Sequence, residues 1–120
     1  MPEILFITDS IPTKLWLKKL SFTYYKKKKF ILNILCIAGY TRQNYYKNTK
    51  KLQTIKFHDC NSKIKINDYL NNKIKKKTLV FKQYNKISKT NFIDNILKKK
   101  NIDTAYISEE NKLQKKKKYF

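Results

Sequence analysis

The chain has 120 residues, of which 29 are lysine or arginine and 8 are aspartate or glutamate, giving a formal net charge of +21 at pH 7. This length suits one small domain with tails. So large an excess of positive charge repels itself, which points to a polyanionic partner: nucleic acid first, an anionic membrane surface second. A single glycine excludes GxGxxG and Walker phosphate loops.

Amino-acid usage is strongly biased. Lysine, asparagine, isoleucine, tyrosine and phenylalanine dominate, whereas glycine, alanine, arginine and proline together supply six residues. The first group has AT-rich codons, so we infer an AT-rich coding genome such as that of an organelle. Lysine contacts phosphate as a flexible point charge, whereas arginine can fork onto a base. We therefore expect contacts to backbone phosphates more than readout of bases.

The first segment of the chain, MPEILFITDSIPTKLWLKK, resembles neither a secretory signal nor an arginine-rich transit peptide. This favours synthesis inside the organelle where the protein works. Residues 1–25 are interpreted as an N-terminal extension that holds a short strand or helix. The longest apolar run, FILNILCIA (30–38), is shorter than the about 20 residues that cross a bilayer. Binding to a membrane surface predicts a basic amphipathic helix, and none is evident, so no membrane partner is expected.

Short apolar or alternating segments follow one another between the lysine runs. The run at 30–38 is typical of a central strand, and no amphipathic helix longer than two turns is evident. The pattern predicts an all-β fold over residues 26–112: five or six short strands in a small, mostly antiparallel barrel or sandwich with basic loops and little helix, then a basic tail over 113–120. The other predicted strands are LQTIKF (52–57), KIKINDYL (63–70), TLVFKQY (78–84), FIDNIL (92–97) and DTAYIS (103–108).

Catalytic residue types cluster only at His58-Asp59-Cys60. Neighbours on an extended segment point to opposite faces, so a Cys/His nucleophile is not expected there. Cys36 lies in an apolar run and is interpreted as a buried small hydrophobe, and no CxxC or HxxxH spacing offers a zinc site. We therefore expect no enzyme, no small-molecule substrate, no metal and no cofactor.

Basic residues interleaved with aromatic rings are the positive signal for RNA binding, because lysines neutralise phosphates and rings stack on unpaired bases. Within this signal, Gly39 is predicted to form a turn with positive φ, and Arg42 a forked contact to a phosphate or base. The predicted RNA-binding residues are Lys26, Lys27, Lys28, Lys29, Tyr40, Arg42, Tyr45, Tyr46, Lys50, Lys51, Lys75, Lys76, Lys77, Lys98, Lys99, Lys100, Lys115, Lys116, Lys117 and Lys118.

The stretch NILCIAGYTRQNYYKNTKKLQTIKF (33–57) resembles the first barrel hairpin of the large-subunit ribosomal protein fourteen family. That family has a strand ending in Cys-Ile, a turn containing Gly, basic residues, a tyrosine and a second strand. KKKTLVFKQYNK (75–86) and DNILKKKNIDTAYISEENK (94–112) continue the resemblance in order, over about residues 28–112. The family's C-terminal Gly-Thr-Arg loop and short helices are absent, and LQKKKKYF stands in their place.

The resemblance implies a five-stranded barrel bound to large-subunit rRNA near the subunit interface. It also implies contacts with neighbouring ribosomal proteins and with small-subunit rRNA at an intersubunit bridge. In the family, the C-terminal segment that is absent here makes these contacts. We therefore expect a structural component of the large subunit of an organellar ribosome, in the mitochondrial matrix or alternatively in a plastid. The alternative function is a free nucleic-acid-binding or compacting protein of an AT-rich organelle, and a peripheral membrane protein is the third.

Overall fold

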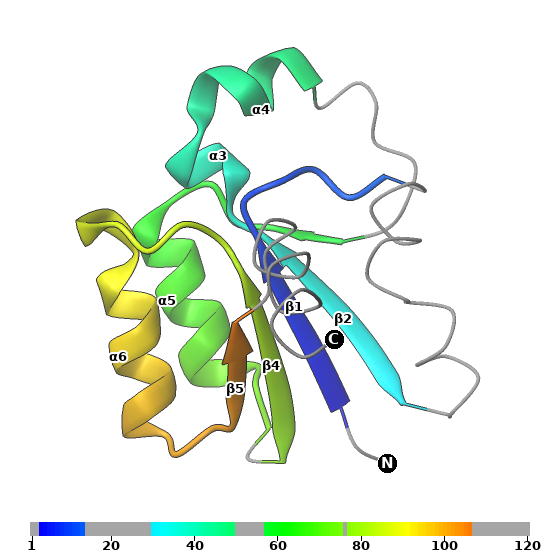
Figure 1. Ribbon diagram of the computed structural model, residues 1–120, viewed down its shortest axis with the longest axis vertical. Helices are drawn as coiled ribbons and strands as arrows, with labels where there is room; N and C mark the ends of the chain where they lie inside the picture. The colour runs from blue at the N-terminus through cyan, green and yellow to red at the C-terminus, as the bar shows by residue number, and fades with distance from the viewer. Residues whose placement is uncertain (1–2, 14–29, 50–56, 76, 107–120) are drawn as a thin grey trace, which may run out of the picture.

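The sheet at the centre of the molecule is all-parallel and is flanked by helices, so the predicted all-β antiparallel barrel is wrong (Figure 1). The computed structural model describes residues 3–13, 30–49, 57–75 and 77–106. The sheet has five strands in the order β3-β2-β1-β4-β5. Their bounds are β1 Glu3–Thr8, β2 Ile31–Cys36, β3 His58–Asp59, β4 Thr78–Gln83 and β5 Thr104–Tyr106.

Strand β1 lies at the middle of the sheet and pairs in parallel with β2 on one side and β4 on the other. Glu3 stands opposite both Ile31 and Thr78 in this register. From Ile4 to Thr8 every residue of β1 is buried, as expected for a parallel strand covered on both faces. Residues that we assigned to an N-terminal extension therefore form the central strand.

Two segments predicted as strands are helices. KIKINDYL (63–70) belongs to α5, and FIDNIL (92–97) belongs to α6, so the expectation of little helix is also wrong. The helices of the described residues are α3 Ala38–Thr41, α4 Gln43–Thr49, α5 Lys63–Asn72 and α6 Asn91–Lys99, with a 3-10 turn η2 at Ser88–Thr90.

Local signals explain where these two helices begin and end. The Ser62 hydroxyl caps α5 by accepting a hydrogen bond from the backbone N–H of Lys65 at 3.2 Å. Helix α6 buries Ile93 and Leu97, which are four positions apart on one face. It ends just before Asn101, whose φ of 54° is the left-handed conformation that often terminates a helix.

The remaining strand predictions have different outcomes. The strands predicted at 30–38 and 78–84 are confirmed by β2 and β4, and β5 occupies part of 103–108. Residues 52–56 and the tail at 113–120 lie outside the described residues. The barrel that the ribosomal resemblance implied is therefore also not the fold of this chain.

One side of the sheet packs against α5 and α6, which lie side by side (Figure 1). Strand residues such as Leu35 and Val80 meet Leu70 of α5 and Leu97 of α6 in the largest core cluster. On the other side, Phe6 and Phe81 stack with ring centroids 5.2 Å apart. Among the described residues, no helix is long and apolar enough to span a membrane.

Candidate nucleic-acid interface

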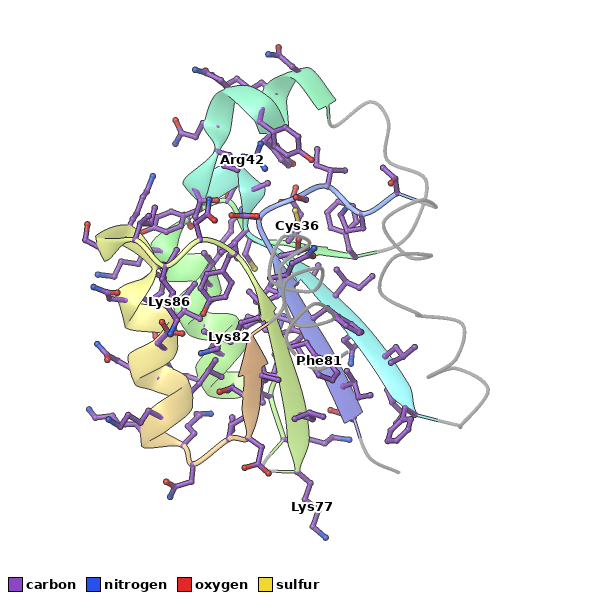
Figure 2. All side chains as sticks on the ribbon, viewed as in Figure 1. Cys36, Arg42, Lys77, Phe81, Lys82 and Lys86 are labelled. Carbon is purple, nitrogen blue, oxygen red and sulfur yellow. The ribbon has the colours of Figure 1, made fainter. Side chains whose placement is uncertain are left out.

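The parallel sheet separates the predicted RNA-binding residues into two groups. The segment that follows β2, Tyr40 to Tyr46, lies at the carboxyl edge of the sheet, where α3 and α4 are found (Figure 1). Lys75 and Lys77 precede β4 at the amino edge, and Lys98 to Lys100 lie at the end of α6 near the same edge. Figure 2 shows Arg42 and Lys77 at opposite ends of the domain. The others, Lys26 to Lys29, Lys50, Lys51, Lys76 and Lys115 to Lys118, lie outside the described residues.

Gly39 does not have the positive φ that we predicted; it lies in helix α3. Its role is steric. A Cβ atom at this position would stand 2.8 Å from the Cβ of Asn61, closer than side chains approach each other. The absence of a Cβ at Gly39 therefore lets the segment after β3 lie against α3. The backbone at Gly39 is helical, so no left-handed residue is needed there.

Arg42 is exposed and is held in place by two contacts at the carboxyl edge. Its guanidinium lies 4.0 Å from the centroid of the Tyr45 ring, and its Nη1 donates a hydrogen bond to the backbone oxygen of Asp9 at 3.4 Å. The Tyr45 hydroxyl accepts a hydrogen bond from the backbone N–H of Ile11 at 2.8 Å. Arginine stacks on a ring in this way while keeping other N–H groups for a ligand. The forked RNA contact remains a prediction.

The Tyr46 side chain makes its contacts with other residues of the chain. Its hydroxyl donates a hydrogen bond to the Asp59 carboxylate, and this bond, together with burial and the nearby negative charge, raises the pKa of Tyr46 to about 12. The rings of Tyr45 and Tyr46 pack against a small core cluster that contains Cys36 and Ala38. Both rings thus have a structural role that the sequence alone did not indicate.

Tyr40 forms part of a strip in which two rings lie between two cations, which we call the Tyr40–Phe92 strip. The Lys89 ammonium lies 4.5 Å from the centroid of the Tyr40 ring, and that ring meets Phe92 edge-on at 5.9 Å between centroids. The Lys63 ammonium lies 5.1 Å from the centroid of the Phe92 ring. Its four residues come from α3, α5, α6 and the turn before α6. Lys63, Lys89 and Phe92 were not predicted from the sequence, because only the folded arrangement of these four elements brings them together.

Two of the basic residues at the amino edge contact other parts of the fold. Lys75 forms an ion pair with Glu3 at 3.2 Å, but its side chain is 75% exposed, so solvent screens the pair. The Lys100 ammonium donates a hydrogen bond to the backbone oxygen of Asn71 at 2.8 Å and so links α6 to α5. Lys77, Lys98 and Lys99 are exposed.

Two hollows open along α6, and they differ in charge. A groove of about 680 Å³ between α5 and α6, which we call the α5–α6 groove, has lysines as its only charged lining residues. It is lined by Lys63, Asn67, Phe92, Asn95, Ile96, Lys98 and Lys99. The other hollow, of about 480 Å³ beside β4 and β5, contains two aspartates, Asp94 and Asp103, beside its lysines. The first hollow is thus the one that suits an anion.

In the second hollow the main cation is already neutralised. The buried Lys82 forms an ion pair with Asp94 at 3.1 Å, and the Tyr84 hydroxyl donates to the same carboxylate oxygen at 2.8 Å. Figure 2 shows Lys82 and Lys86 along the same side of the domain. We interpret Lys82 as a structural residue that joins β4 to α6.

The His58-Asp59-Cys60 cluster is divided between surface and interior. His58 is exposed and its ring lies 5.0 Å from that of Tyr69, whereas Cys60 is buried, and burial raises the pKa of its thiol. Cys36 is buried as predicted, and burial raises its pKa to about 12. Within the described ranges, no group of three or more His, Cys, Asp or Glu side chains could hold a metal ion.

Comparison with known proteins identifies no relative: no protein-family model matches the chain, and neither a curated protein nor a solved structure matches it.

Proposed function

We propose that the protein binds RNA as a structural part of a ribonucleoprotein, and that this assembly is the large subunit of a mitochondrial ribosome. The sequence resembles a ribosomal protein family, but the barrel fold of that family differs from the parallel sheet observed here. The support for the proposal is therefore electrostatic: ribosomal RNA is a polyanion able to compensate a formal charge of +21 on 120 residues. Neighbouring ribosomal proteins, and small-subunit rRNA at a bridge, are proposed as further partners.

The observation that carries the RNA-binding proposal is that the basic side chains are mostly exposed, whereas the acidic side chains mostly accept hydrogen bonds within the fold. Of the thirteen lysine and arginine residues that the structure describes, eleven are exposed. The acidic residues, in contrast, are mostly engaged within the fold. Five of the six that lie in the same ranges, Glu3, Asp9, Asp59, Asp68 and Asp94, accept hydrogen bonds from other residues of the chain.

The position of α6 favours nucleic acid over a lipid surface as the polyanion. A helix that lies on a membrane directs its apolar face to the lipid. In α6 this face carries Ile93 and Leu97, and both are buried against the sheet. Lys98 and Lys99 remain exposed, and the Tyr40–Phe92 strip adds the rings that RNA-binding surfaces use for stacking.

Gradient sedimentation of an organelle lysate containing the tagged full chain tests the proposal. We expect the chain to move with large subunits and to be released when the RNA is digested. A chain that stays at the top of the gradient while large subunits migrate would refute the ribosomal assignment. Sedimentation with organellar DNA, insensitive to ribonuclease, would instead support the free nucleic-acid-binding protein.

A further inference from the structure

The α5–α6 groove joins an apolar floor and a set of cations on one solvent-facing side of the helical layer. Its floor is apolar, because Phe92 and Ile96 line it and also pack against the main core cluster. Its cations are Lys63, Lys98 and Lys99, all exposed. Among the described residues, none of these three lysines forms an ion pair with a carboxylate. The groove therefore presents a positive surface around an aromatic ring.

The positions along the helices set the layout of the groove. In α6, Phe92, Asn95, Ile96 and Lys99 recur at three- and four-residue intervals and so share one face. From Phe92 to Lys99 the helix rises by about 10 Å. In α5, Lys63 and Asn67 are one turn apart on the opposite wall. The ring thus lies at one end, the amides in the middle and Lys99 at the other end.

The Phe92 ring is restrained rather than free to turn. It meets the Tyr40 ring edge-on, with an interplanar angle of 90°, and Tyr40 is itself fixed by Lys89. The Lys63 ammonium lies over the ring, 5.1 Å from its centroid, so this flexible side chain must swing aside to a flanking phosphate when a base stacks there. A restrained ring costs little entropy to use as a stacking platform.

We propose that the α5–α6 groove binds an unpaired segment of RNA, with one base stacked at Phe92. The side-chain amides of Asn67 and Asn95 both donate and accept hydrogen bonds, as the edge of an unpaired base requires. Lys63 and Lys99 neutralise the flanking phosphates. This inference rests on the proposed RNA-binding function and assigns it a site and a class of RNA.

The groove is unsuited to paired RNA for a geometric reason. In an A-form duplex the base faces are covered by stacking and only groove edges and phosphates are accessible. A half-buried ring at the floor of a groove reaches a base only where that base is unstacked. The site should therefore distinguish single strands from duplexes, which an unstructured lysine-rich surface would not do.

The test measures binding of the full chain to a labelled oligouridylate of ten nucleotides, over a range of salt concentrations. We expect Phe92→Leu to weaken binding about 5- to 100-fold with an unchanged salt slope, because it removes stacking and no charge. Phe92→Tyr should retain the affinity. We expect K63Q together with K99Q to reduce the slope of log K against log salt by about 1.4, since each phosphate contact to a single strand contributes about 0.7.

Matched controls separate the groove from the general charge of the protein. Lys47 and Lys65 are exposed and do not line the groove, so K47Q together with K65Q removes the same charge elsewhere. We expect this pair to change the slope by less than K63Q with K99Q does. We also expect Phe92→Leu to leave binding to a duplex of equal length unchanged. Unfolding curves of all variants identify any loss of folded protein.

The outcomes distinguish the inference from the function on which it rests. If the wild-type chain binds neither oligouridylate nor duplex RNA, the proposed function fails and the groove proposal fails with it. If the wild type binds but the folded Phe92→Leu and lysine variants bind equally well, only the groove proposal is overturned. Displacement of the oligouridylate by decaglutamate at equal charge concentration would also overturn it, because an acidic peptide would then be an equivalent occupant.

Discussion

Tyr40 and Lys89 are 49 positions apart in the chain and exchange two hydrogen bonds. The Tyr40 hydroxyl donates to the backbone oxygen of Lys89 at 3.0 Å, and the Lys89 ammonium donates to the backbone oxygen of Tyr40 at 2.6 Å. The same ammonium lies over the tyrosine ring. This reciprocal pair fastens α3 to the turn before α6 at the carboxyl edge of the sheet.

A double-mutant cycle on this pair should show coupling. We expect Tyr40→Phe and Lys89→Met each to lower the free energy of unfolding by about 0.5–1.5 kcal/mol, the usual contribution of one hydrogen bond. The two changes together should cost less than their sum, because each bond holds the geometry that the other bond needs, so losing one already weakens the second. Urea unfolding of the four proteins measures the coupling, and strictly additive losses would show that the two bonds act independently.

Gly39→Ala should destabilise the protein although the residue lies in a helix. Helix propensity alone favours alanine by about 1 kcal/mol. The added Cβ would meet the Cβ of Asn61 at 2.8 Å and the Cα at 3.3 Å, so one of the two segments must move. We expect a net loss of about 1–3 kcal/mol in the free energy of unfolding, as for overpacked sites.

The control for this clash is the double variant Gly39→Ala with Asn61→Gly. Asn61→Gly removes the Cβ that causes the closest contact. Gly39→Ala should therefore cost less stability in the Asn61→Gly background than it does in the wild type. A Gly39→Ala protein as stable as the wild type would mean that the segment after β3 moves aside at no cost.

Asp94→Asn should be more damaging than its exposure suggests. The Asp94 carboxylate neutralises the buried Lys82 and also accepts from the Tyr84 hydroxyl. Without it, a buried ammonium loses its counter-charge, and we expect a loss of about 2–3 kcal/mol in the free energy of unfolding. Chemical denaturation measures this.

Replacing both partners provides the comparison for Asp94. Lys82→Met with Asp94→Asn removes the ammonium as well, so it should be more stable than Asp94→Asn alone. A double variant that is the less stable of the two would contradict a charge-pairing role for Asp94.

The pH dependence of stability should contain a contribution from Asp9. Burial raises the pKa of its carboxyl above the ordinary value of 3.8, although a hydrogen bond from the backbone N–H of Asn85 and the attraction of Arg42 lower it. A raised pKa means that the folded state holds this proton more tightly than the unfolded state. The contribution to stability is therefore full below 3.8 and is lost as the pH rises through the titration of folded Asp9.

Asp9→Asn isolates this contribution, because the amide oxygen can still accept from Asn85 and cannot ionise. We expect the variant to gain stability relative to the wild type as the pH rises above about 4, in urea unfolding measured over a pH series. If the wild type gained instead, the attraction of Arg42 would outweigh the cost of burial.

Parts of the fold were predictable from the chain, and the errors have specific causes. The apolar run of β1 is continuous, which is typical of a parallel strand buried on both faces. The alternation of Ile64 and Ile66 suggested a strand, yet Ile66 is buried and Ile64 is exposed on helix α5. The Ser62 cap was the local signal that would have favoured a helix there.

The candidate site was predictable in kind but not in place. Lysines beside rings indicated a basic surface with aromatic side chains, and Tyr40, Lys98 and Lys99 were among the residues named. Phe92 and Lys63 are 29 positions apart, and only the contact between α5 and α6 brings them together. A sequence pattern that is read locally contains no information on such a pair.

The central place of β1 also determines the order in which the sheet can be completed. Glu3 lies opposite Thr78, 75 positions later, so β1 is synthesised well before its second neighbour, β4. Pairings over such distances fold slowly, because the chain pays the entropy of closing a long loop before it gains the contact. Deletion of residues 1–8 should divide the sheet into two separate pairs, β2 with β3 and β4 with β5.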